Sequence, residues 1–264
     1  MDEFVKMASK QLGGSSMKQH NNELAIDCFL LAGRIMMESG AETYRVEDTM
    51  LRMAKSQQLD DAQSYATPTG IIFSLGKTQP TRITSIPNRV TDLHKIALVN
   101  NVSRKLTSQI ITLEQAYDEL KKIQSTNYFL PLYIQVLAAS VASSCFLFLF
   151  GGNLEDLPVA FIAGGIGHYI VSVVHEATKV KFFSEFFAAL ICGIIAFIAI
   201  GQGFGKDIDK IILGSVMPLV PGLLITNAVR DLMAGHFTAG MAKGVEALLT
   251  AFAIGSGVAV VLSF

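Results

Sequence analysis

Residues 213–235 read LGSVMPLVPGLLITNAVRDLMAG, an apolar run long enough to lie in a bilayer, with Pro218 and the pair Pro221-Gly222 near its middle. Each proline removes a backbone N–H, and its ring clashes with the carbonyl one turn earlier. In lipid, the polar backbone groups that a broken helix frees must be satisfied by protein, ligand or trapped water. We therefore predict a helix that is broken at membrane depth, where a polar molecule can bind.

The composition around this run divides the chain into a polar half and an apolar half. The chain has 264 residues, of which 51% are hydrophobic and 16% are charged, and this is too apolar for an ordinary soluble protein. Of its 43 Asp, Glu, Lys and Arg residues, 29 lie in residues 1–130 and 14 in residues 131–264. The net charge of −1 does not support binding to nucleic acid. Three widely separated cysteines do not support a disulfide or a metal site, and no cofactor is expected.

Residues 22–128 predict a small cytoplasmic α+β domain, preceded by a flexible tail at residues 1–21. Apolar residues recur at helical spacing on either side of a segment rich in Ile, Thr, Tyr and Phe, which favours strands. Ser39-x-x-Glu42 fits a capping box for the second helix, and Thr43 is an equally good cap. We expect helices at residues 22–39, from 41 onward, 90–108 and 113–124, and strands at 63–67, 71–75 and 81–86.

The apolar half, residues 129–264, predicts an all-α membrane bundle of five transmembrane helices. A helix needs about 20 apolar residues to cross a hydrocarbon core of about 30 Å. Such runs lie at residues 131–150, 157–174, 184–202, 208–229 and 244–264, and the fourth contains the broken helix. Small residues also recur at four-residue spacing, which lets helices approach closely in lipid. They are Ala160 and Gly164, Ala163 and Gly167, and Ala251 and Gly255.

The charges of the connecting segments predict the orientation of the bundle. Residues 151–156 contain no Lys or Arg, and residues 201–209 contain one Lys balanced by two Asp. Residues 175–185 carry two Lys, and residues 230–243 are basic at both ends. Because basic loops stay in the cytoplasm, we expect a multi-pass protein of the inner or plasma membrane with its N-terminus in the cytoplasm and its C-terminus outside.

Three blocks of sequence, in this order and spacing, resemble the threonine/serine exporter family. They are SGAETYRVED at residues 39–48, TPTG at residues 67–70, and the block from Pro221-Gly222 through Asn227 and Arg230-Asp231 to Gly235. The resemblance covers about residues 22–264 and is closest to the larger, N-terminal component of the split two-subunit form. It implies a cytoplasmic domain followed by a membrane bundle, and a separate small membrane subunit that supplies the second half of the transporter.

A physical argument also favours a second half. Many secondary transporters bind substrate between two structural repeats, with broken helices near the middle of the membrane. Five spans with one broken helix supply only half of such a site. The other half comes from a small partner subunit or from a second copy of this chain in a homo-oligomer.

The broken helix is the first candidate for a substrate path, formed by Pro218, Pro221 and Gly222. A helix that restarts after Gly222 points its N-terminal N–H groups into the membrane, where their partial positive charge suits a carboxylate. Threonine, serine and succinate all carry a carboxylate, so this geometry does not choose among them. The alternative is a purely structural kink.

Polar residues follow the break directly. Asn227 and Arg230 lie one turn apart, and Asp231 can pair with a basic group, so the three extend the predicted substrate path as contacts or a gate. The alternative is that they anchor the helix at the membrane surface, where Arg230 would follow the distribution of basic residues.

Two further sets of residues have candidate roles. His168 lies inside the second predicted span and could relay protons, or could hydrogen-bond to a neighbouring helix and have only a structural role. The resemblance places Glu42, Arg45 and Glu47 in the family's cytoplasmic motif, where they could form a charged site or a docking contact, or lie on a solvated helix face.

Together these features predict a secondary transporter subunit, not an enzyme, that exports small carboxylate-bearing metabolites across the lipid bilayer. The resemblance favours threonine and serine with proton coupling, and succinate is the alternative substrate. A zwitterionic substrate needs an acidic partner for its ammonium group. The acidic residue identified inside the spans is Glu246, near the start of the fifth, so a dicarboxylate is favoured if the partner adds none. A membrane-anchored enzyme or sensor is the alternative from another class, but an anchor needs one span and not five.

Overall fold

The computed structural model describes residues 21–76 and 80–263, so the tail predicted at residues 1–21 lies, apart from residue 21, outside the described residues. The chain groups into two compact units. The first contains residues up to 128 together with Thr226–Lys243, and the second contains Phe129–Ile225 and residues from Gly244 onward. A segment from the apolar half of the sequence therefore belongs to the N-terminal unit.

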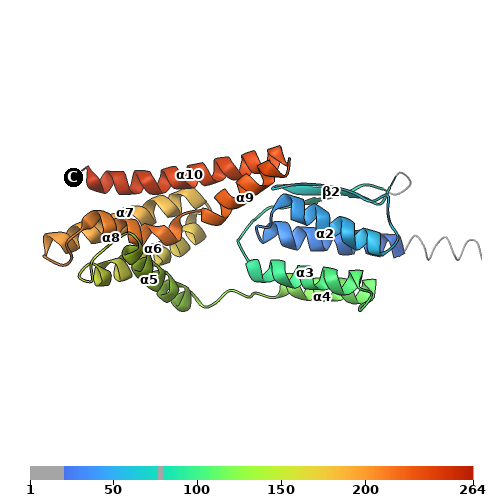
Figure 1. Cartoon of the computed structure of the whole chain (residues 1–264), viewed down its shortest axis with the longest axis horizontal. Helices are drawn as coiled ribbons and strands as arrows, with labels where there is room; N and C mark the ends of the chain where they lie inside the picture. The colour runs from blue at the N-terminus through green and yellow to red at the C-terminus, as the bar shows by residue number, and fades with distance from the viewer. Residues whose placement is uncertain (1–20, 77–79, 264) are drawn as a thin grey trace, which may run out of the picture. The chain divides into compact units, whose positions relative to one another are not determined.

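The first unit has the predicted α+β architecture. Its three strands form an antiparallel meander in the order β1-β2-β3, in which Ile72 pairs with Tyr65 on one side and with Ile83 on the other. Its elements are a helix at residues 21–38, α2 (Thr43–Ser56), β1 (Gln63–Thr67), β2 (Gly70–Ser74), β3 (Arg82–Ser85), α3 (Leu93–Thr107) and α4 (Leu113–Ser125) (Figure 1). The predicted helices and strands are confirmed within a few residues at each end.

The alternation of side chains along the strands explains how this unit packs. Ile71 and Phe73 are fully buried, whereas Ile72 between them is exposed, as expected for a strand with one covered face. The Phe73 ring meets the edge of Phe29 from the first helix, with 6.0 Å between ring centroids. Figure 1 shows the helices on one side of the sheet, so the unit has one core.

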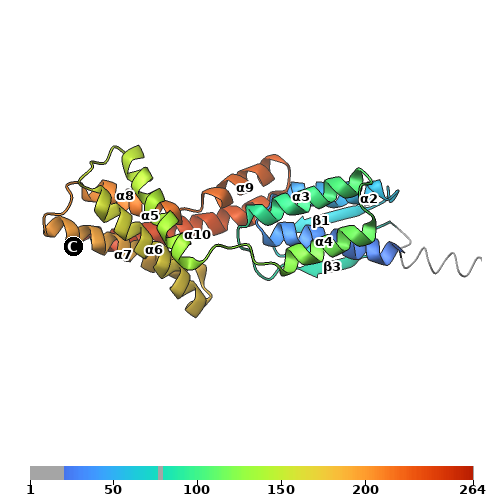
Figure 2. The ribbon, with the colours of Figure 1, turned by 90° about the horizontal axis from the view of Figure 1, so that it is seen from below.

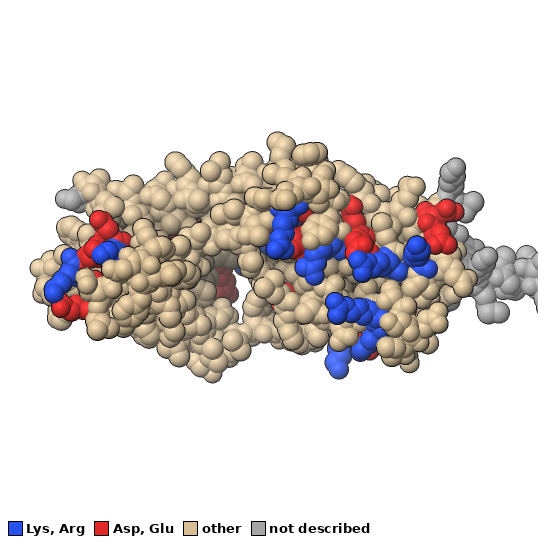
Figure 3. All heavy atoms as spheres, viewed as in Figure 1, with Lys and Arg blue, Asp and Glu red and all other residues tan. Residues whose placement is uncertain are grey.

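The second unit is a helical bundle with the composition of a membrane domain. Four helices are long and apolar enough to span a membrane, and a bent pair gives a fifth candidate if it is counted as one span, in agreement with the predicted fold class. Only 28–39% of each span's most apolar stretch is buried, and the face seen in Figure 3 is nearly uncharged except at one end. The helices are α5 (Leu132–Leu149), α6 (Leu157–Thr178), α7 (Lys181–Gly201), α8 (Ile208–Val216), η1 (Met217–Leu219), α9 (Gly222–Met233) and α10 (Phe237–Leu262), and α9 and α10 include residues of both units.

The break between α8 and α9 lies at the predicted prolines. Pro218 stands in the first turn of the short η1 helix, where a proline ring is tolerated. Val220 is extended, with ψ of 130°, because the ring of Pro221 disfavours a helical residue before it. A new helix then starts as Ile225 N–H donates to the carbonyl of Pro221 at 3.0 Å. The two segments are bent by 59°.

Small residues allow the bundle helices to pack closely, as predicted for Gly164 and Gly167. A Cβ at Gly164 would collide with the Ser143 side chain, and one at Gly167 would collide with the Cys192 sulfur. A Cβ added at Gly214 would lie 3.0 Å from backbone atoms of α5. Gly255 is different, because nothing lies within 4 Å of a Cβ added there, so its spacing does not mark a helix contact among the described residues.

Candidate functional site

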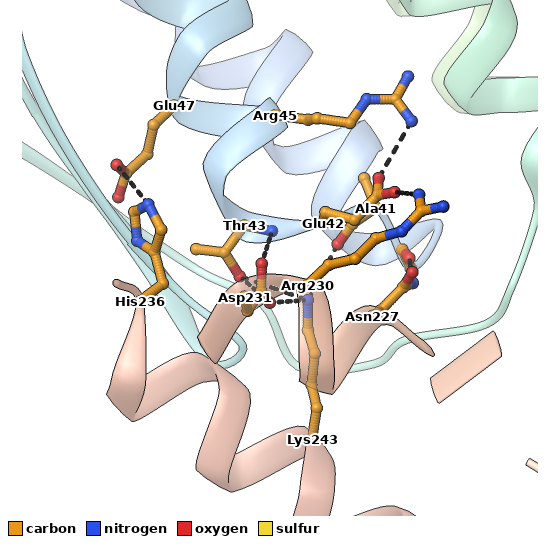
Figure 4. Close-up of polar contacts among 11 residues, drawn as sticks. Ala41, Glu42, Thr43, Arg45, Glu47, Asn227, Arg230, Asp231, His236 and Lys243 are labelled. Atoms are coloured by element: carbon orange, nitrogen blue, oxygen red, sulfur yellow. Dashed lines mark hydrogen bonds and ion pairs between the residues drawn. The ribbon is translucent and has the colours of Figure 1, made fainter. Parts of the chain in front are cut away.

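A polar cluster joins the N-terminus of α2 to residues 226–243, and all of it lies within the first compact unit (Figure 4). Its members come from two regions of sequence about 190 residues apart. We call it the α2 cluster. It consists of Glu42, Thr43, Asn227, Arg230, Asp231 and Lys243.

The Asp231 carboxylate caps the N-terminus of α2. It accepts hydrogen bonds from the Thr43 N–H and the Thr43 hydroxyl, each at 2.9 Å. The first N–H groups of a helix lack partners inside the helix, and their dipoles favour a negative charge. The predicted caps are therefore wrong: Glu42 is the N-cap residue but makes no side-chain cap bond, and the capping box that starts at Ser39 does not form.

Lys243 neutralises this carboxylate in the interior of the unit. Its Nζ lies 2.7 Å from Asp231 Oδ2, and the two side chains are 3% and 0% exposed. The ammonium also donates to the carbonyl of Ala41 at 3.1 Å and to the Thr43 hydroxyl at 3.3 Å. A buried ion pair is stable only when further hydrogen bonds satisfy both ions, and here both have them. Lys243 was missed by the sequence analysis because it stands one residue before a predicted span and there resembles an ordinary basic flank.

Glu42 connects Arg230 of α9 to Arg45 of α2. Its two carboxylate oxygens lie 2.7 Å from Arg230 and 3.0 Å from Arg45, and the side chain is almost fully buried. Burial alone would raise the pKa of Glu42, but a backbone hydrogen bond, the hydrogen bond from Arg230 and the charge of Arg45 together hold it below its ordinary value. Beside this pair, Asn227 donates to the carbonyl of Gly40 at 2.9 Å.

Glu47 and His236 form a second contact between α2 and the same segment. Glu47 accepts from the Ala66 N–H at 2.7 Å, and its other oxygen lies 3.7 Å from His236 Nε2. Burial raises the pKa of Glu47, and the nearby charge of Asp231 adds to this, although the Ala66 N–H and the charge of His236 oppose it. His236 was not identified from the sequence.

The structure thus brings together two of the predicted sets of residues. Glu42, Arg45 and Glu47 of the cytoplasmic motif meet Asn227, Arg230 and Asp231 in one unit, which gives the SGAETYRVED block and the Arg-Asp block a common structural role. The other predicted residues lie in the second unit. They are His168, Pro218, Pro221 and Gly222.

Comparison with known proteins agrees with this combination of blocks. Residues 27–264 match the model of a protein family described as "Putative threonine/serine exporter". The chain belongs to the threonine/serine exporter family. The resemblance inferred from the sequence is therefore confirmed, and with four to five candidate spans this exporter-family chain is a multi-pass membrane protein. Membership of a transporter family also indicates a transporter and not a membrane-anchored enzyme.

Individual relatives of this exporter-family chain differ in length. "Probable succinate transporter subunit YjjP" of Klebsiella aerogenes is 23% identical over 246 residues, which cover 91% of this chain and 92% of the relative. "Probable threonine/serine exporter" of Mycobacterium tuberculosis is 22% identical, but the match spans only 45% of that protein. "Pheromone-regulated membrane protein 10" of Kluyveromyces lactis is 25% identical over 24% of its length. No solved structure matches the chain.

His168 has the partner that its structural interpretation requires. The residue is half-buried on α6, and its Nε2 lies 3.4 Å from the side-chain oxygen of Gln135 on α5. This contact is compatible with either role considered for His168, because a histidine that relays protons also needs a polar neighbour.

The predicted spans contain a second acidic residue that the sequence analysis missed. Glu185 stands at the second position of the predicted span 184–202, and it is 7% exposed between helices. The carboxylate of Glu246 on α10, which was identified from the sequence, lies 3.4 Å from the Nζ of Lys181, one turn before Glu185 on α7. Glu185 was missed because a carboxylate close to a lysine at the end of a span resembles an interfacial pair.

Next to Arg45, a hollow of about 210 Å³ opens between α2 and α3. Figure 3 shows Lys and Arg side chains gathered over these helices. With three guanidinium groups and one carboxylate in its wall, the hollow has the chemistry of a site for a small anion. Its lining residues are Arg45, Asp48, Thr49, Arg52, Asn100, Ser103, Arg104 and Thr107.

The charges of the α2 cluster are satisfied within the protein. Arg230 is paired with Glu42 and Lys243 with Asp231, so the cluster fixes residues 226–243 to the N-terminus of α2. A substrate carboxylate could reach either cation only by displacing an internal carboxylate. Such an exchange is the chemistry of a gate more than that of an open binding site.

Proposed function

We propose that this chain is one subunit of a secondary transporter that exports small carboxylate-bearing metabolites, with threonine and serine as substrates. The observation that carries the proposal is the broken span α8–α9 in a chain of the exporter family, bent by 59° at its prolines. Broken helices form substrate sites in many secondary transporters, because the ends of the half-helices present partial charges inside the membrane.

The start of α9 is the proposed contact for the substrate carboxylate. The helix begins at Gly222, directly after Pro221; the Gly222 N–H donates to the carbonyl of Val220 at 2.8 Å, and a Cβ added at Gly222 would meet no described atom within 4 Å beyond its own helix backbone and chain neighbours. A helix N-terminus favours a negative group by its dipole and its N–H groups. Pro218 and Pro221 keep this end of the helix from joining α8, so they complete the proposed substrate path.

Asn227, Arg230 and Asp231 are proposed to form the gate of this path. The same helix that begins at the proline break is held in its later part by the α2 cluster. Opening the Glu42–Arg230 pair would remove one of these contacts while Arg45 continues to neutralise Glu42, and release of α9 would also need the Asn227 and Asp231 contacts to open. In this proposal the cytoplasmic motif controls a helix that reaches the substrate.

The proposed orientation has the N-terminus in the cytoplasm and the C-terminus outside. Asp156 supports it, because this buried carboxylate accepts from the N–H groups of Lys206 and Asp207 and so joins the two loops with few basic residues at one end of the bundle. Burial alone would raise the pKa of Asp156, but these N–H groups and that of Asn153 hold it below its ordinary value. We assign this end to the outside.

We further propose a separate small membrane subunit as the partner. The relatives that this chain covers almost completely are named transporter subunits, and the exporter of which it covers 45% is a longer chain. A homo-oligomer is the alternative. Coupling is proposed to use the proton gradient, with His168 as one candidate relay.

Succinate is the second candidate substrate. The relatives matched over 92–93% of their length are named succinate transporter subunits, in Klebsiella aerogenes and in Escherichia coli. A dicarboxylate needs a second positive contact, and the partner subunit would have to provide it, because Arg230 and Lys243 are already paired.

An export assay in intact cells tests the proposal. Cells without their own exporters would be loaded with labelled threonine or succinate, and release would be followed with this chain, with the partner subunit, and with both. We expect release of one substrate only when both chains are present, and a strong loss with Pro221→Ala. Pro158→Ala is the matched control, because Pro158 lies in the first turn of α6, where proline is tolerated. Equal release from cells without either chain would contradict the proposal.

A further inference from the structure

A buried carboxyl group that is not one of the proposed substrate-path residues lies between α7 and α10. Glu185 is 7% exposed, and its Oε2 has no hydrogen-bond partner among the described residues. Thr250 of α10 is fully buried, and its hydroxyl lies close enough to Glu185 to favour the charged carboxylate, although it makes no hydrogen bond of standard geometry within the described part of the chain. Two unsatisfied polar groups that face each other inside a bundle need a reason, because each costs free energy to bury.

Close packing of α7 and α10 keeps water from this position. The helices lie side by side (Figures 1 and 2), and a Cβ added at Gly257 of α10 would meet the backbone of α7 at Phe186 and Leu190. Ser184 and Ala188, the neighbours of Glu185 on α7, are almost completely buried. The carboxyl group therefore lies in the interior of the bundle, one turn from the partly exposed Lys181 at the start of α7.

The charged groups near Glu185 leave it only partly neutralised. Among the described residues, Lys181 one turn earlier on α7 favours its charged form, and Glu246 on α10 opposes it. Lys181 is itself engaged by Glu246, with 3.4 Å between Nζ and Oε1. The helices α6 and α8 also pack against α7 but contribute no charged group to Glu185 within the described chain.

These neighbours can satisfy the carboxyl group in both of its protonation states. As a carboxylate it can accept from the Thr250 hydroxyl, with Lys181 as the nearest positive charge. As a neutral acid it carries an O–H bond on the oxygen that now lacks a partner, and it can donate that proton to the oxygen of Thr250. A carboxyl group inside a membrane domain that has partners in both states can take up a proton from water and return it.

We propose that Glu185, with Thr250 as its hydrogen-bond partner and the Lys181–Glu246 pair beside it, is a proton-binding site that couples export to the proton gradient. The inference rests on the proposed transport function and deepens it. It assigns proton binding to a residue outside the substrate path. It also separates coupling from substrate binding, so the two can fail independently.

Proteoliposomes that contain this chain and its partner subunit test the inference. Two rates are measured: exchange of labelled for unlabelled substrate at equal pH, and substrate movement driven by a pH gradient. We expect Glu185→Gln to keep exchange and to lose gradient-driven movement. Glu176→Gln, which removes an exposed carboxylate near the end of α6, should leave both rates unchanged.

Each outcome has a distinct meaning. If Glu185→Gln retains gradient-driven movement with the pH dependence of wild type, the inference is wrong and the transport proposal stands. If wild type moves neither substrate, the transport proposal fails first. If Glu185→Gln loses both rates, infrared spectra decide: wild type must show a carboxyl band that titrates with pH and is missing in the variant. Absence of such a band would overturn the inference.

Discussion

The replacement Lys243→Met tests the α2 cluster most severely, because it removes one ion of a pair whose side chains are 3% and 0% exposed. The Asp231 carboxylate would keep its two hydrogen bonds from Thr43 but lose Lys243, the cation paired with it in the interior. Removing one partner of a buried ion pair costs about 3–5 kcal/mol, so we expect the first unit to open more easily by that amount. The surface pair Lys105–Glu119 is the control, and Lys105→Met should cost about 0–1 kcal/mol.

The assay uses a thiol in the core of the same unit. Cys28 is fully buried, and burial raises its pKa to about 12, so it reacts only when the unit opens. Labelling of the full-length protein in micelles, with Cys145 replaced by serine and Cys192 resolved by mass spectrometry, reports the opening equilibrium. A cost of 3–5 kcal/mol predicts labelling about 10²–10⁴ times faster in Lys243→Met.

The double variant separates charge pairing from loss of packing. With Asp231→Asn and Lys243→Met together, no unpaired charge is buried, so the cost should fall to about 1–3 kcal/mol for the lost hydrogen bonds. Asp231→Asn alone leaves Lys243 unpaired and should also cost about 3–5 kcal/mol, so the coupling energy between the two positions should be about 6 kcal/mol in magnitude. Additive effects of the single variants, or a Lys243→Met protein that labels as slowly as wild type, would refute the role of the pair.

Three further predictions concern pH, helix packing and the loops that Asp156 joins. The pKa of Glu42 lies below its ordinary value of 4.5 in the folded protein, so the ionised Glu42 stabilises the fold above pH 4.5. This stabilisation is lost as the pH falls through the pKa of the folded state. In thermal unfolding followed by circular dichroism, Glu42→Gln should therefore lose less stability on acidification than wild type. Gly214→Ala should destabilise by about 1–3 kcal/mol, because the new Cβ meets backbone of α5, whereas Gly255→Ala should be neutral in the same unfolding assay; equal effects would contradict the packing. Asp156→Asn should cost about 1–3 kcal/mol, since an amide replaces a carboxylate that accepts several N–H groups, and an unchanged melting curve would exclude that role.

Local patterns in the sequence were sufficient for the elements of the fold. The β-branched and aromatic residues from Ile71 to Phe73 predict a strand, and β2 forms there. Pro221 predicts the break in the fourth span, because its effect on the preceding residue needs no tertiary context. The membrane spans follow from length and hydropathy for the same reason.

The site depends on contacts that no local pattern contains. The local sequence offered Ser39 and Thr43 as caps for α2. The side chain that caps the helix is instead that of Asp231, which is 188 residues from Thr43 in the sequence. Charge decided this outcome, because a carboxylate neutralised by Lys243 satisfies a buried helix end better than a hydroxyl does. From the sequence, the residues after the break were candidates for substrate contact, a gate or a membrane anchor. The structure places them in internal contacts of the α2 cluster, and their action as a gate is our proposal.

The most direct measurement is the movement of labelled threonine and labelled succinate through proteoliposomes under an imposed pH gradient. Vesicles would contain this chain alone, the small partner subunit alone, or both. The account predicts net accumulation of one of the two substrates only in vesicles that contain both chains, and only while the gradient lasts. Movement through either chain alone would contradict the two-subunit transporter, and no movement of either substrate in any vesicle would contradict carboxylate export itself.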